Sequence, residues 1–187
     1  MARRTRFLAL IAGLIAVVAC GGGGGGGSPT QPAPSPSPPP QQPQIVFTSN
    51  GNVSGVVLAR ATTSTATTLV LEVRASEVSG LYGVAFDLTY PSAVLHYRAA
   101  HTGPFLGAGS VEVSTQVAET SPGHLVVGVS RLGQSGGVDG SGLLLSLDFD
   151  AVAAGSGAFS FSKNSAFRPD GSPQQVGWSA GTVTVVR

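Results

Sequence analysis

From about residue 53 to the end of the chain, apolar and polar residues alternate with a period of two. Between Val111 and Ala118, for example, valine and threonine alternate with glutamate, serine and glutamine. Such alternation is typical of strands with one buried face, and no window shows sustained helical periodicity. The pattern predicts nine strands, at residues 53–60, 67–75, 81–90, 94–101, 111–118, 124–130, 143–151, 158–162 and 182–186.

Clusters of Gly, Ser, Pro and Asp separate these strands. They lie at residues 79–80, 90–92, 107–110, 121–123, 133–142 and 169–171. Short strands that alternate with such turns favour an antiparallel β-sandwich or barrel, and a sandwich is the fold class predicted here. Residues 45–187 are long enough to form one domain around a single hydrophobic core.

The N-terminal segment has the anatomy of a signal peptide. Three arginines precede a run of twelve apolar residues, Phe7–Val18, which only Gly13 interrupts and which is too short for a membrane span. The ending Val17-Val18-Ala19-Cys20 resembles the bacterial lipobox, which implies cleavage after residue 19 and lipidation of Cys20. An ordinary secretory signal with an incidental cysteine is the alternative.

Residues 20–44 are expected to form a disordered tether. Seven glycines, Gly21–Gly27, precede a Pro-rich stretch at residues 28–44, and neither piece has apolar surface to bury. The proline stretch should extend as polyproline II and act as a stiff spacer. The predicted organisation is a signal peptide at 1–19, the lipidated cysteine and linker at 20–44, and a folded domain at 45–187.

Charge and composition exclude several functions. The precursor has a net charge of +1, but removal of residues 1–19 leaves seven basic and nine acidic residues, a formal charge of −2. No basic field is present for nucleic acid, and lysine occurs once, as Lys163. The single cysteine excludes an internal disulfide framework and a Cys-rich zinc site. No cofactor is predicted, and the expected contact with a membrane is through the lipid alone.

Several segments resemble the cohesin family. Leu81–Leu95 is similar to the cohesin segment in which alternating apolar residues lead to a Tyr-Asp-Pro turn, although the aspartate is absent between Tyr90 and Pro91. The runs 140–151 and 155–161 resemble two further cohesin strands with their glycine-containing connection, and 170–185 resembles the closing strand. The resemblance implies a nine-stranded jelly-roll sandwich that is non-catalytic and docks a dockerin on a secreted polysaccharide-degrading enzyme. Calcium in such a pair belongs to the dockerin.

Two sets of residues are candidate binding sites. Ser146, Asp148 and Asp150 have the parity opposite to their buried neighbours, which places them on one outward face, either as a recognition surface or as an ordinary solvated face. Tyr97 and Trp178 are candidates for sugar stacking, although aromatic residues make up only 6% of the chain. Direct polysaccharide binding and a structural or adhesive envelope role therefore stay open beside protein docking.

Catalytic and metal-binding motifs are weak in this chain. Gly133–Gly137 matches G-x-S-x-G around Ser135, but loop residues follow it where a nucleophile elbow needs a helix. The isolated Asp139 and Asp170 fit turn chemistry better than a calcium loop. The three histidines, His96, His101 and His124, are too dispersed for a metal site. We predict a non-enzymatic, extracytoplasmic protein, and Gly21 after the lipidated cysteine favours the outer membrane or cell surface.

Overall fold

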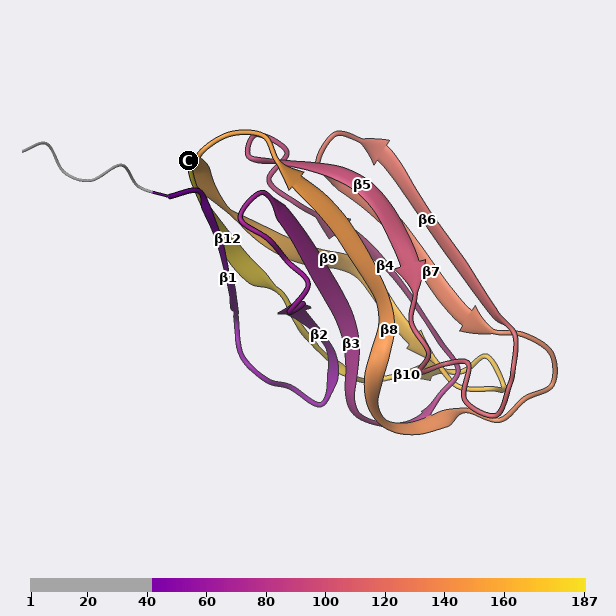
Figure 1. Cartoon of the computed structure of the whole chain (residues 1–187). Helices are drawn as coiled ribbons and strands as arrows, with labels where there is room; N and C mark the ends of the chain where they lie inside the picture. The colour runs from indigo at the N-terminus through magenta and orange to yellow at the C-terminus, as the bar shows by residue number, and fades with distance from the viewer. Residues whose placement is uncertain (1–41) are drawn as a thin grey trace, which may run out of the picture. The chain divides into compact units, whose positions relative to one another are not determined.

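The computed structural model describes residues 42–187, so the predicted signal peptide, Cys20 and most of the tether lie outside the described residues. The described residues belong to one compact unit. Its described part is all-β, without a helix (Figure 1). The strands are β1 (Gln44–Ser49), β2 (Gly55–Arg60), β3 (Thr68–Leu81), β4 (Gly83–Thr89), β5 (Leu95–Thr102), β6 (Val113–Ser121), β7 (His124–Arg131), β8 (Val138–Ala151), β9 (Gly155–Phe167), β10 (Pro173–Gln174), β11 (Gly177–Ser179) and β12 (Gly181–Val186).

The strands form two sheets that pack as a sandwich. The first runs β1-β12-β9-β4-β7-β6, with short β10 beside β9, and is called the large sheet below. The second runs β11-β2-β3-β8-β5 and is called the small sheet. All pairings are antiparallel except that of β11 with β2. The predicted antiparallel sandwich is confirmed, with β3, β5 and β8 of the small sheet in front of β4 and β9 in Figure 1.

The core lies between the sheets and follows the predicted alternation. In β4 and β7 every second side chain faces the core, with Phe86, Leu125 and Val127 at most 1% exposed. Phe149 of the small sheet packs edge-on against Phe159 of the large sheet, with 5.7 Å between ring centroids. Burial of this apolar surface is the dominant favourable contribution to folding.

Three short strands were not expected from the sequence. In β1, Ile45 is buried and Phe47 packs on Phe159, so this segment adds an edge strand to β12. β10 and β11 have two and three residues, too few for a period of two to be visible. β11 pairs in parallel with β2, where a Cβ built on Gly55 would lie 2.1 Å from the Gly177 carbonyl oxygen. Only glycine permits so close an approach.

The chain enters the domain beside its C-terminus. Gln44 pairs with Val186 at the outer end of β12, and Gly155 at the start of β9 pairs with Val185 (Figure 1). β9 then runs through twelve residue steps, about 40 Å at the usual rise of a strand. The opposite end of the large sheet, at Phe167, therefore lies far from the point where the predicted tether joins.

A buried tyrosine makes the stability of the domain sensitive to alkali. Tyr90 is 3% exposed and its hydroxyl donates a hydrogen bond to Glu119. Burial, and next this hydrogen bond, raise the pKa of Tyr90 above 10.0, and burial together with the Glu119 charge raises the pKa of Tyr97. The folded state thus holds both phenolic protons more tightly than the unfolded state does.

We therefore expect the free energy of unfolding to be insensitive to these tyrosines below pH 10 and to fall as the pH rises above it. Urea denaturation between about pH 8 and 11 measures this slope. Tyr90→Phe should reduce the slope, and the double variant with Tyr97→Phe should reduce it further. An equal slope in wild type and double variant would contradict the assignment.

Candidate functional site

The outer face of β4, β7 and β6 is made mostly of short side chains. Across these strands Ala85 pairs with Gly128, which pairs with Gln116. One step along, Asp87 pairs with Val126, which pairs with Ala118. Val126 is 41% exposed, one of four exposed large hydrophobic side chains in the described chain. This side of the large sheet, which ends at the edge strand β6, therefore presents a low, weakly charged surface to solvent.

Gly128 is the feature of this face that packing within the domain does not explain. Its φ is not in the left-handed region, and a Cβ built on it would meet no atom within 4 Å. Glycine in a strand interior costs about 0.5–1 kcal/mol relative to alanine. Where neither a turn nor a packing contact requires it, glycine in a strand often marks the close approach of a ligand or another backbone.

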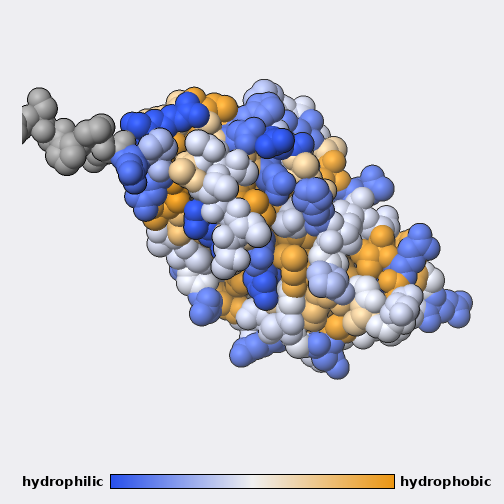
Figure 2. Space-filling view, in the orientation of Figure 1, coloured by the Kyte–Doolittle hydropathy of each residue, from blue (hydrophilic) through white to orange (hydrophobic). Residues whose placement is uncertain are grey.

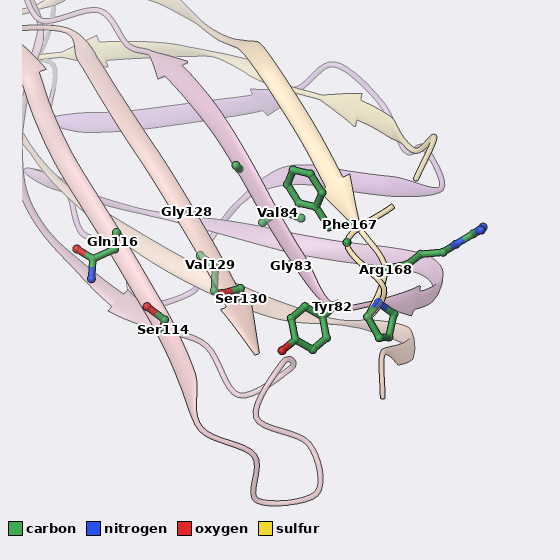
Figure 3. A pocket seen from close by; sticks show the side chains of 13 residues that line it. Tyr82, Gly83, Val84, Ser114, Gln116, Gly128, Val129, Ser130, Phe167 and Arg168 are labelled. Carbon is green, nitrogen blue, oxygen red and sulfur yellow. The ribbon is translucent and has the colours of Figure 1, made fainter. Parts of the chain in front are cut away.

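Above Gly128 the surface is hollowed, with a cavity of about 400 Å³ that we call the hollow. Its floor is Ala85 and Gly128, and Figure 3 shows Gln116 on one side and Phe167 on the other. Tyr82 closes the lower end, where its hydroxyl donates a 2.7 Å hydrogen bond to the Gly133 carbonyl. The lining is predominantly apolar, so the hollow fits an apolar group that projects from a binding partner.

A charge cluster lies next to the hollow and consists of Asp87, His124 and Lys163. The Asp87 side chain is only 8% exposed, and its Oδ2 atom lies 3.0 Å from Lys163 Nζ and 3.5 Å from His124 Nε2. Thr120 fixes the imidazole through a 2.8 Å contact of its Oγ1 with His124 Nδ1. The lysine side chain, in contrast, is 81% exposed. Within the cluster, the Asp87 carboxylate is therefore buried, whereas the Lys163 side chain is exposed to solvent.

A β-bulge in β9 places this lysine. Ala85 pairs with Ser165 but Asp87 pairs with Ser162, so two residues of β9 oppose Phe86. Lys163, the first of the two, has a φ of 47°, which is uncommon for a residue with a side chain. Bulges re-aim side chains and are enriched beside functional sites, and such strained positions persist where the surrounding structure holds them.

The structure places Ser146, Asp148 and Asp150 on β8, on the outer face of the small sheet, which confirms their predicted outward direction. Both aspartates have partners within the domain. Asp148 lies 3.3 Å from His101 Nε2, and Asp150 accepts hydrogen bonds from Arg98 and Thr68. Figure 2 looks onto this side of the molecule, which is mixed and largely hydrophilic. Its role as a recognition face stays a prediction.

Tyr97 and Trp178 are not brought together. They lie on β5 and β11, which are opposite edge strands of the small sheet. Trp178 is half-buried and packs edge-on against Phe86 and Phe161, with centroid distances of 5.7 and 5.1 Å. Tyr97 packs against Phe149 at 5.8 Å. Sugar stacking by these residues also stays a prediction, but the geometry gives them no shared platform.

The weak motifs have structural roles. Ser135 lies in the loop before β8, where its Oγ accepts a hydrogen bond from Arg131 Nε at 3.2 Å. Asp139 accepts from the Gly80 amide at 2.6 Å. Asp170 accepts from the hydroxyl and amide of Ser172, and these hydrogen bonds hold the pKa of Asp170 below its usual range. Asp139 and Asp170 therefore stabilise local backbone geometry, at a bulge and at a turn.

Within residues 42–187 no group of three or more His, Cys, Asp or Glu side chains is arranged to hold a metal ion. The same residues contain no helix long and apolar enough to cross a membrane. The hollow and the adjacent charge cluster together form the candidate site.

Comparison with solved structures finds cohesin modules. The sixth cohesin of scaffoldin B from Acetivibrio cellulolyticus, solved in complex with a dockerin, has a TM-score of 0.54 and 20% identity, and the match covers 68% of this chain and 96% of that one. A type II cohesin from the cellulosome of the same organism has a TM-score of 0.54 at 14% identity, covering 73% and 95%. A cohesin module from a Clostridium perfringens family 33 glycoside hydrolase has a TM-score of 0.54 at 10% identity, covering 73% and 97%.

These likenesses show the fold, and the domain accordingly has the cohesin fold that the sequence resemblance implied. The nine predicted strands are present, and the three short strands are added to them. Comparison with family models finds no match, and neither does comparison with curated proteins.

Proposed function

We propose that this protein is a non-catalytic docking module that binds a dockerin-type partner through the hollow of its large sheet. The cohesin fold supports this proposal, since one neighbour of that fold was solved with a dockerin bound. The observation that carries it is Gly128, which lowers the floor of an apolar hollow although the packing of the domain does not require glycine there. A fold alone would not be sufficient, because one fold can host many functions.

The position of the hollow suits a protein that is displayed from a membrane. The chain enters at Gln44, and the hollow lies around Gly83 and Phe167 at the far end of β9. With Cys20 lipidated, the tether would join one end of the domain and leave the docking surface at the other end accessible. We infer an extracytoplasmic, lipid-anchored protein at the outer membrane or cell surface, which would hold a secreted polysaccharide-degrading enzyme there.

A pull-down experiment tests the docking proposal. The unit from residue 39 to 187, which contains every described strand, is immobilised and incubated with the secreted proteins of the source organism, first with calcium and then with EDTA. Capture of a protein that EDTA releases is expected, because the calcium would belong to a dockerin. Mass spectrometry should identify that protein, and its sequence should contain paired calcium-binding loops.

A Gly128→Leu variant of the same unit is the matched control, since leucine fills the hollow from a position where its Cβ meets no other atom. The proposal predicts that this variant captures nothing. Capture that is equal in wild type and variant, or no calcium-dependent capture at all, would overturn docking at the hollow. Binding of the wild-type unit to insoluble polysaccharide would then point to the alternative that uses Tyr97 and Trp178.

A further inference from the structure

We propose that a second cavity, on the outer face of the small sheet, binds a neutral disaccharide unit of a glycan. This cavity, called the cleft below, has a volume of about 450 Å³, which is within the usual range for small-molecule sites. It lies between β2, β3 and the loop that joins β1 to β2. Because the hollow is on the other sheet, this inference goes beyond the proposed docking and does not depend on it.

Two segments of fixed backbone form the walls of the cleft. On one side, the Gly177 amide donates a 2.8 Å hydrogen bond to the Ser54 carbonyl and holds the loop from β1. On the other side β3 bulges, since Ser76 and Glu77 both lie opposite Ser141, whose Oγ accepts a 2.8 Å hydrogen bond from the Glu77 amide. Figure 1 shows the start of β2 beside the second half of β3. Walls fixed in this way bind a ligand at a small cost in conformational entropy.

Glu77 has a strained backbone conformation at the border of the cleft. Its φ is 50°, which is uncommon for a residue with a side chain and which glycine adopts at lower cost. Such strained positions cluster at ligand sites, where the surrounding structure holds them. The Glu77 carboxylate lies across from the Ser54 hydroxyl, which donates to its Oε2 atom at 3.1 Å. The second carboxylate oxygen can accept a hydrogen bond from a ligand.

The polar groups of the cleft match the hydroxyl groups of a sugar. Of its ten lining residues, Arg74 carries the one positive charge and Glu77 the one negative charge, so a neutral ligand is favoured over an ion. Arg74 donates to Glu72 at 2.7 Å and its side chain is 41% exposed, so its other N–H groups can reach a ligand. A sugar hydroxyl both accepts and donates, and neighbouring hydroxyls can therefore pair with the guanidinium group and with the carboxylate.

The dimensions of the cleft favour two sugar rings over one. Arg74 and Glu77 are three residues apart on β3, which spans up to about 10 Å. A single pyranose ring is shorter than this distance, whereas a disaccharide reaches both charged groups. Val57 and Ala59, at successive outward positions of β2, provide an apolar floor for the C–H groups of the sugar. The lining contains no aromatic ring, so we expect an affinity in the millimolar range.

Titration of the isotope-labelled unit 39–187 with defined probes, followed by two-dimensional NMR, tests this inference. The probes are cellobiose, maltose and N,N′-diacetylchitobiose, with glucose as the single ring and glycylglycine as a zwitterion of similar length. We expect at least one disaccharide to shift the amide signals of Ser54, Glu77 and Ser141, with an affinity about tenfold above that of glucose. No shift with any disaccharide, shifts with glycylglycine alone, or shifts confined to the surroundings of Tyr97 and Trp178 would overturn the inference.

Variants with matched controls separate binding from stability. Glu77→Gly removes the carboxylate and relieves the strain, so affinity for the disaccharide should fall about tenfold while the urea midpoint stays equal or rises. Ser110→Gly is its control, because Ser110 has a φ of 59° outside the cleft and should bind as wild type does. Arg74→Gln should also weaken binding, whereas Arg98→Gln, in an exposed ion pair with Asp150, should not. Unchanged affinity in Glu77→Gly or in Arg74→Gln contradicts the site.

Discussion

Replacement of Arg131 by alanine is expected to lower the free energy of unfolding by about 3–5 kcal/mol. Arg131 is 6% exposed, and its guanidinium group donates to the carbonyl oxygens of Leu106 and Ala108 and to Ser135 Oγ. None of the salt bridges among residues 42–187 includes it, so the buried charge is satisfied by neutral oxygen atoms alone.

The expected loss is large because one side chain joins three segments of the chain. Arg131 ends β7 and holds both the loop that leads into β6 and the loop that leads into β8. Alanine would leave the buried Leu106 carbonyl without its partner and would remove the buried methylene groups as well. Hydrogen bonds from a charged donor contribute about 1.5–3 kcal/mol each.

Urea denaturation of the unit 39–187 measures the effect as a shift in midpoint at constant slope. Arg131→Lys should recover part of the loss, since an ammonium group can reach fewer of the three acceptors. Arg98→Ala is the matched control, because its ion pair with Asp150 joins side chains that are 57% and 42% exposed and should contribute less than about 1 kcal/mol. A loss in Arg131→Ala no larger than that in Arg98→Ala would contradict the structural role.

The sandwich could be predicted because the alternation of apolar and polar residues that indicates it lies within single strands. In β4, β7 and β8 the alternation of side chains reports directly which residues are buried, and Asp148 and Asp150 accordingly point outward as expected. β1 was missed because residues 44–49 directly follow a proline-rich stretch, although Ile45 and Phe47 do alternate. Its place in the sheet depends on pairing with β12 at the other end of the chain.

The candidate site was not predicted because its parts are distant in sequence. Asp87 and Lys163 meet only because β4 pairs with β9, and a bulge that no residue pattern announces directs the lysine. Gly128 was a visible signal, since it interrupts the apolar run from Leu125 to Val129. This signal could be interpreted only with the structure, which shows that neither the backbone conformation nor the neighbours of Gly128 require glycine.

The two outer faces of the sandwich differ in a way that bears on which one binds. On the small sheet, Asp148 and Asp150 each have a polar partner on a neighbouring strand, so their charges are already satisfied. On the large sheet, an exposed valine lies together with a hollow that has a glycine floor, and the exposed Lys163 side chain beside them is ion-paired with Asp87. Desolvated apolar anchors with a polar border are the usual source of binding energy in protein interfaces.

Because the hollow lies on the large sheet, the second large effect is expected for Gly128→Leu, on the affinity for the partner. Its affinity for the protein captured by the wild-type unit should fall at least about 100-fold, equivalent to about 2.7 kcal/mol, because the side chain would occupy the space of the partner's anchor. Its stability should be equal to or slightly above that of wild type, since glycine is the less favourable residue in a strand and the new Cβ meets nothing within 4 Å.

Isothermal titration calorimetry and urea denaturation measure the two quantities on the same samples. Gly136→Leu is the control for the substitution itself, because Gly136 also has open space around its Cβ but lies in the loop before β8, outside the lining of the hollow. The double variant Asp148→Ala/Asp150→Ala tests the opposite face and should bind as wild type does. If this double variant loses affinity while Gly128→Leu retains it, recognition belongs to the outer face of the small sheet, as the parity of Ser146, Asp148 and Asp150 first suggested.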